Sequence, residues 1–91
     1  MLYVTIYLPT DTTTQDALMA TYPRHRAYLD EFAKGGQIVH IGTFADGLEP
    51  RSMAVFRTAE AAEEFMANDP LVLEGLAFPE GPREWNSIDF I

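Results

Sequence analysis

Cysteine is absent from this 91-residue chain, which excludes a disulfide framework and a metal site built from thiolates. Basic residues are scarce: six lysines and arginines stand against fourteen acidic residues, so the formal charge is −8. This charge repels phosphate backbones and anionic headgroups, and we expect neither nucleic acid nor a membrane as a partner. No stretch approaches the roughly 20 apolar residues that a membrane span needs. We therefore expect a cytoplasmic protein.

The residues that are present are typical of one globular domain covering residues 1–91. Hydrophobic residues make up 47% of the chain and charged residues 22%, which argues against a disordered or fibrous protein. A chain this short leaves a large share of its surface unburied when it folds alone. Association of two copies would complete the core, and we expect a homodimer.

The first half of the chain shows a strand followed by helix signals. Residues 2–8 alternate between two apolar faces, which is the pattern of a strand. Threonines at 10–14 can cap a short helix that reaches about Ala20. Because proline fits the first turn of a helix but not its middle, the main helix is predicted from near Pro23 to Lys34.

The second half predicts a hairpin, a helix and a final strand. Residues 37–44 and 52–57 are the predicted hairpin strands, joined by a turn at Asp46-Gly47. Thr58 can cap a helix that ends before Asp69, and Asp69 can cap one further turn that Pro70 opens. Prolines and a glycine at 79–82 would interrupt a central strand, so the last strand is predicted at residues 84–90.

This order predicts an α+β fold, a split βαβ arrangement with an antiparallel sheet and both helices on one face. The predicted strands carry apolar side chains on both faces. A sheet face that no helix covers and that is rich in apolar residues indicates an interface, so a second copy is expected to pack there.

His25 is the first candidate for chemistry, because imidazole accepts and donates protons near neutral pH. It lies at the start of an apolar helical stripe with Leu29 and Phe32, so it can equally be a buried structural histidine. Asp69 is the second candidate, since a carboxylate that accepts an imidazole N–H fixes the ring tautomer. Local sequence favours a helix cap for Asp69 and does not show that the two residues meet.

His40 lies in the second predicted strand, where it can face a partner subunit or line a cavity. The two histidines show none of the spacings of known metal motifs, so no metal site is expected. Cofactor motifs are also missing, and we expect chemistry without a cofactor.

A set of residues in a fixed order extends from the first strand to the last. These are Pro23-Arg24-His25-Arg26-Ala27-Tyr28-Leu29, Gly36, Ile41-Gly42, Phe65, Asn68-Asp69-Pro70, Gly75-Leu76 and Trp85. With this set, the chain resembles the YCII family (YciI-like proteins) of the dimeric α/β-barrel superfamily.

The resemblance implies a ferredoxin-like βαββαβ protomer, a homodimer whose sheets form a barrel, and a cleft with a histidine and an aspartate as its active-site pair. These roles fall on His25 and Asp69. The resemblance also implies that Gly42 keeps the cleft free of a side chain. Many members carry an arginine three residues before the histidine, whereas this chain has Tyr22 there and Arg24 beside His25, so the charge of the substrate is left open.

We interpret the chain first as an enzyme of the lyase, isomerase or dehydrohalogenase type. His25 and Asp69 would act by general acid–base catalysis on a small organic molecule. Arg24, Tyr28, Gly42 and His40 are the expected substrate-binding residues. The alternative is a non-catalytic module that binds or senses a small ligand, since one fold serves many functions. A cofactor-free monooxygenase ranks last, because it rests on fold analogy only.

Overall fold

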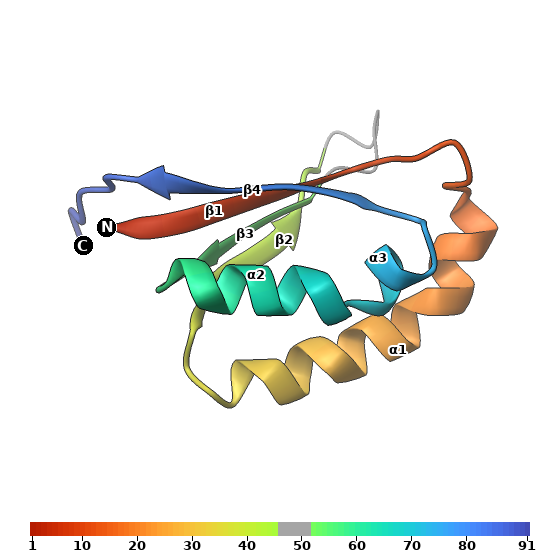
Figure 1. The fold of residues 1–91 in the computed structure, drawn as a ribbon, viewed down its shortest axis with the longest axis horizontal. Coiled ribbons are helices and arrows are strands. Elements are labelled where there is room, and N and C mark those ends of the chain that lie inside the picture. The colour runs from red at the N-terminus through yellow and green to blue at the C-terminus, as the bar shows by residue number, and fades with distance from the viewer. Residues whose placement is uncertain (46–51) are drawn as a thin grey trace.

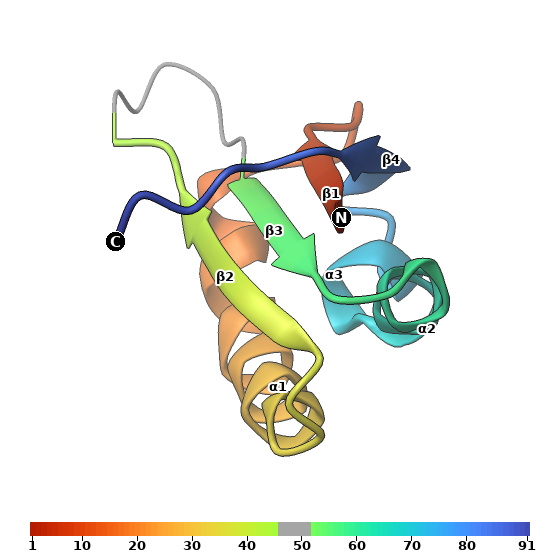
Figure 2. The same cartoon turned by 90° about the vertical axis from the view of Figure 1, so that its left-hand side faces the viewer.

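The computed structural model describes residues 1–45 and 52–91. Its elements are β1 (Leu2–Leu8), α1 (Gln15–Ala33), β2 (Ile38–Thr43), β3 (Ser52–Phe56), α2 (Ala59–Asn68), α3 (Pro70–Leu73) and β4 (Phe78–Trp85). The strands form one antiparallel sheet in the order β2-β3-β1-β4, and α1 and α2 lie on the same face of it (Figure 1, Figure 2). This is the ferredoxin-like α+β fold that the sequence predicts. The predicted turn at Asp46-Gly47 lies outside the described residues.

Helix α1 corrects the prediction that Pro23 begins the main helix. Thr14 caps a single 19-residue helix by accepting the N–H of Ala17 at 3.1 Å, and Pro23 lies inside it. Proline has no N–H for the carbonyl four residues earlier, and the helix axis changes direction along its length (Figure 1). That carbonyl belongs to Met19, which is 65% exposed, so water can replace the lost partner.

The core lies between the sheet and the helices, on the face of β1 that carries Thr5 and Tyr7. These residues are 1% and 6% exposed, and the paired strand β3 contributes the buried Phe56 to the same layer. From α2, the apolar residues Ala62, Phe65 and Met66 are buried. Leu29 and Phe32 of α1 pack against this cluster.

Strand β4 corrects the prediction of a last strand at residues 84–90. It begins at Phe78 and includes Pro79, which pairs with Tyr7 of β1. The sheet order places β4 at an edge, where a proline does not break a hydrogen-bond ladder on both sides. The register of the pair shifts between Val4 and Ile6, which accommodates the irregular segment.

Gly81 is required at this irregularity. Its φ is +112°, and a Cβ built on it would lie 2.7 Å from the carbonyl oxygen of Val4. We expect Gly81→Ala to lower the free energy of unfolding by about 1–3 kcal/mol, measured by urea denaturation. Gly42→Ala is the matched control, since a Cβ there meets no atom within 4 Å, and equal losses in the two variants would contradict the explanation.

The opposite face of the sheet carries no helix in the part of the chain that the structure describes (Figure 2). Val4, Ile6, Met53 and Trp85 line a shallow pocket of about 300 Å³ there. Among the described helices, none is long and apolar enough to cross a membrane.

Candidate active site

Asp69 occupies the junction between α2 and α3 and is completely buried. Its Oδ1 accepts the backbone N–H of Leu71 at 3.0 Å, which is the predicted cap of α3. The sequence left a choice between a helix cap and a partner for His25. The structure combines both functions, because a carboxylate has two oxygens with several lone pairs.

His25 lies in the middle of α1, and its Nδ1 is 2.8 Å from Oδ1 of Asp69. An ionised carboxylate can only accept a hydrogen bond, so this contact places a proton on Nδ1 of a neutral ring and leaves Nε2 with its lone pair. The side chain is 11% exposed. Because α1 begins at Gln15, His25 does not have the position near a helix N-terminus that the predicted start at Pro23 gave it.

Tyr7 completes a buried group of three residues. Its hydroxyl donates to Oδ2 of Asp69 at 2.7 Å. Burial, followed by the charge of Asp69 and the hydrogen bond to it, raises the pKa of Tyr7 well above its ordinary range. Tyr7 therefore remains a phenol and orients the carboxylate. The alternation of β1 predicts which residues share a face with Tyr7 but not which residue its hydroxyl meets.

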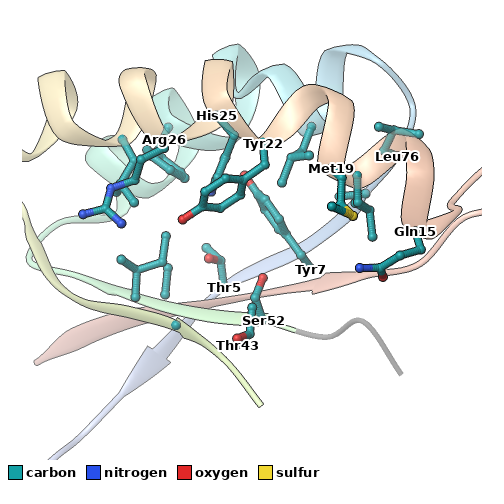
Figure 3. A pocket seen from close by; sticks show the side chains of 18 residues that line it. Thr5, Tyr7, Gln15, Met19, Tyr22, His25, Arg26, Thr43, Ser52 and Leu76 are labelled. Carbon is teal, nitrogen blue, oxygen red and sulfur yellow. The ribbon is translucent and has the colours of Figure 1, made fainter. Parts of the chain in front are cut away.

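Two residues of this group, Tyr7 and His25, border a cavity of about 560 Å³ between α1 and the sheet, whereas Asp69 does not line it (Figure 3). Its size is within the range of small-molecule sites. The polar lining residues on the sheet side are Thr5, Thr43 and Ser52, and those on α1 are Gln15, Tyr22, His25 and Arg26. Much of the remaining lining is aliphatic. The arrangement supplies a base in a largely apolar environment, which suits proton transfer to or from a small organic molecule.

The other sequence-predicted site residues lie in different places. Gly42 lines the cavity, yet a Cβ there meets no atom within 4 Å, so lack of space does not require glycine. Arg24 does not line the cavity, and its guanidinium pairs with Glu74 at 2.7 Å. The Tyr28 hydroxyl donates to the backbone carbonyl of Phe65 at 3.0 Å. His40 is exposed and pairs with Val55 in the register of β2 and β3, outside the cavity.

Arg26 lines the cavity although it was not among the predicted site residues. Its side chain is 57% exposed, and its Nε donates to Asp30. The arginine side chain is long enough to contact Asp30 at the surface and also to lie at the rim of the cavity. Within residues 1–45 and 52–91, no three histidine or acidic side chains gather as metal ligands would.

Tyr28 gives the site region a measurable response to alkaline pH. Burial, then the charges of Asp69 and Glu64, raise the pKa of Tyr28 from 10.0 to about 12. The folded state therefore holds the phenol proton over a pH range in which the unfolded state releases it, so the contribution of Tyr28 to stability is lost as pH rises from about 10 towards 12.

We expect phenolate absorbance of the folded protein to include a component that titrates near pH 12, and Tyr28→Phe to remove it. Tyr3→Phe is the control and should leave that component in place. Disappearance of the component in Tyr3→Phe alone would contradict the assignment.

A family model and a solved structure are similar to this chain. The model of the YCII-related domain matches residues 1–80, whereas no curated protein sequence matches the chain. Among solved structures, the chain is similar to 5-chloro-2-hydroxyhydroquinone dehydrochlorinase from Burkholderia phenoliruptrix, determined in complex with 2,5-dihydroxybenzoquinone. The two are 21% identical with a TM-score of 0.65, over 93% of this chain and 96% of that chain. This similarity shows the shared fold.

Proposed function

The chain belongs to the YCII family, and from the geometry of its site we propose that it is an enzyme that acts on a small organic molecule by general acid–base catalysis. His25 is the proposed catalytic residue and Asp69 its positioning residue. The observation that carries the proposal is the buried 2.8 Å contact between Nδ1 and Oδ1 at the wall of a cavity of about 560 Å³. Histidines that serve only to fill a core do not need a carboxylate partner and a cavity together.

In the proposed step, Nε2 of His25 removes a proton from a C–H or O–H group of the substrate. The electron pair of the broken bond moves into a new π bond, C=C or C=O. In an elimination, the leaving group departs as an anion with its own bonding pair, so the substrate loses one proton and one anion in total. In an isomerisation, His25 returns the proton to a different atom. Asp69 stabilises the imidazolium in both cases, and Tyr7 holds the second carboxylate oxygen.

The name of the structurally similar protein supports the elimination branch, because loss of hydrogen chloride from a ring is such a reaction. We therefore propose a lyase, isomerase or dehydrohalogenase-like activity. The direct assay is chloride release from 5-chloro-2-hydroxyhydroquinone, with binding of 2,5-dihydroxybenzoquinone as a separate readout.

A test that does not depend on one substrate is exchange of carbon-bound hydrogen in deuterium oxide. A panel of small carbonyl compounds and hydroxylated aromatic compounds is incubated with the protein, and the loss of proton NMR signals is followed. The proposal requires exchange or chloride release that depends on His25. Ligand binding without either reaction would instead indicate the non-catalytic binding or regulatory module.

We also propose that residues 1–91 form one domain that assembles into a homodimer through the helix-free sheet face. Support comes from the apolar residues Val4, Ile6, Met53 and Trp85 of the pocket on this face, whose rim also carries Glu80, Arg83 and Glu84. Trp85 is 45% exposed. Phe90 and Ile91, which follow β4, are almost fully exposed, so further apolar surface is available for burial.

Replacing Ile6 with glutamate should convert the dimer into a monomer, because association would have to take a carboxylate out of water at the centre of this face, beside Glu80 and Glu84. Light scattering coupled to gel filtration should give about twice the protomer mass of 10.2 kDa for the parent protein and about that mass for Ile6→Glu. Leu73→Glu is the control, since Leu73 is 69% exposed on α3 and does not line the sheet pocket. A monomeric parent protein would contradict the proposed dimer.

A further inference from the structure

We propose that the ligand of this cavity is an anion and that Arg26 binds its negative group, an inference that rests on the proposed function of the site. The ligand class is a small organic acid with an apolar body and an anionic oxygen group, either a carboxylate or an ionised enol or phenol. Arg26 is then a specificity-determining residue.

The charge of the cavity lining is opposite to that of the whole chain. Fourteen acidic residues give the protein its charge of −8, yet none of them is among the described residues that line the cavity. The titratable residues in that lining are Tyr7, Tyr22, His25 and Arg26, of which Arg26 alone carries a permanent charge. The negative charge nearest to His25 is the buried Asp69, which His25 and Tyr7 already engage.

The guanidinium of Arg26 keeps donors available for a ligand. Its Nε donates to Oδ1 of Asp30 at 3.0 Å, an ion pair between residues one helical turn apart. The side chain of Tyr22 also interacts with the guanidinium. The two contacts restrain the Arg26 side chain and leave further N–H groups of the five for a ligand. Both terminal NH₂ groups extend away from the helix (Figure 3). Such a planar fork matches the oxygens of a carboxylate and also binds a single anionic oxygen.

Arg24 provides an internal comparison. The two arginines flank His25 in the sequence, but the terminal nitrogen of Arg24 is bound to Glu74 at 2.7 Å and the residue does not line the cavity. The helix therefore presents one of the two flanking arginines to the cavity. If only the overall positive charge of this part of α1 mattered, Arg24 and Arg26 would contribute equally to anion binding.

The order of the lining residues along the cavity predicts how the ligand is oriented. In Figure 3, Arg26 and Gln15 lie at opposite ends of the cavity, with His25, Tyr22 and Thr5 between them. An anionic group bound to Arg26 therefore lies at the end of the cavity opposite Gln15, with Tyr22 and His25 between the two. The body of the ligand then extends past Tyr22, whose ring centroid is 5.8 Å from that of His25. Beyond it, the apolar residues Met19 and Leu76 line the cavity (Figure 3).

The test compares benzoate with benzamide, two probes of nearly equal shape that differ in charge. NMR titration of the backbone amides should show that the parent protein binds benzoate about fivefold to tenfold more tightly, because a half-exposed ion pair is partly screened by water. Arg26→Gln should bind the two probes equally. Arg24→Gln, the matched control, should keep the parent preference for benzoate.

Equal binding of the two probes by the parent protein would overturn the proposal. A loss of preference in Arg24→Gln as large as in Arg26→Gln would also overturn it. That result would indicate that the positive charge of both arginines attracts the anion without a specific contact to Arg26. His25→Gln separates this inference from the proposed catalysis, because it should strongly reduce the exchange rate and keep the benzoate preference. An Arg26-dependent preference in a protein with no exchange activity would support the anion site while the catalytic proposal fails.

Discussion

Replacing His25 with glutamine should reduce the rate of proton exchange or elimination by about 10²-fold to 10⁴-fold, the usual contribution of a general base. Glutamine is close to histidine in length, and its amide can still donate to Asp69, so the buried carboxylate keeps a donor. The amide has no lone pair basic enough to remove a proton from carbon. Exchange rates in deuterium oxide and thermal unfolding of the same variant check both parts of this expectation.

His40→Gln is the matched control, since His40 is the other histidine of the chain and is exposed outside the cavity. Its exchange rate should equal that of the parent protein. A His25→Gln variant that remains folded and retains activity within tenfold of the parent would remove His25 from the chemistry.

Replacing Asp69 with alanine should lower the free energy of unfolding by about 3–5 kcal/mol, which is the usual cost of removing one partner of a buried pair. Asp69 is completely buried and accepts from three donors, namely Tyr7, His25 and Leu71. Alanine leaves the Tyr7 hydroxyl without its partner and removes the cap of α3, which alone is worth about 1 kcal/mol. Urea denaturation should show a lower midpoint with an unchanged slope.

Glu74→Ala is the control for this loss. Its ion pair with Arg24 is exposed, with side-chain exposures of 45% and 60%, so its removal should change stability by no more than about 1 kcal/mol. Asp69→Asn preserves the size of the side chain and the cap of α3. Its loss of unfolding free energy should lie between the losses in Asp69→Ala and Glu74→Ala. If Asp69→Ala were no less stable than Glu74→Ala, the buried network would not contribute to stability as the geometry indicates.

Local signals predicted most of the fold correctly. The alternation in residues 2–8, the cap at Thr58 and the Asp69-Pro70 junction each depend on neighbouring residues, and each is confirmed. The two wrong boundaries both involve proline. Pro23 is tolerated inside α1 because the carbonyl that loses its partner is near solvent, and Pro79 is tolerated in β4 because that strand lies at the edge of the sheet. Solvent exposure and edge position are properties of the assembled fold.

The sequence by itself determined the strand and helix types, the helix caps and, through a family resemblance, the candidate pair His25 and Asp69. Tertiary structure alone decided that these residues, 44 positions apart, meet at 2.8 Å and that Tyr7 joins them from the first strand. It also decided that Arg26 rather than Arg24 lines the cavity. The physical reason is that periodicity fixes the face on which a side chain lies, whereas contacts between distant segments depend on how the sheet and helices pack together.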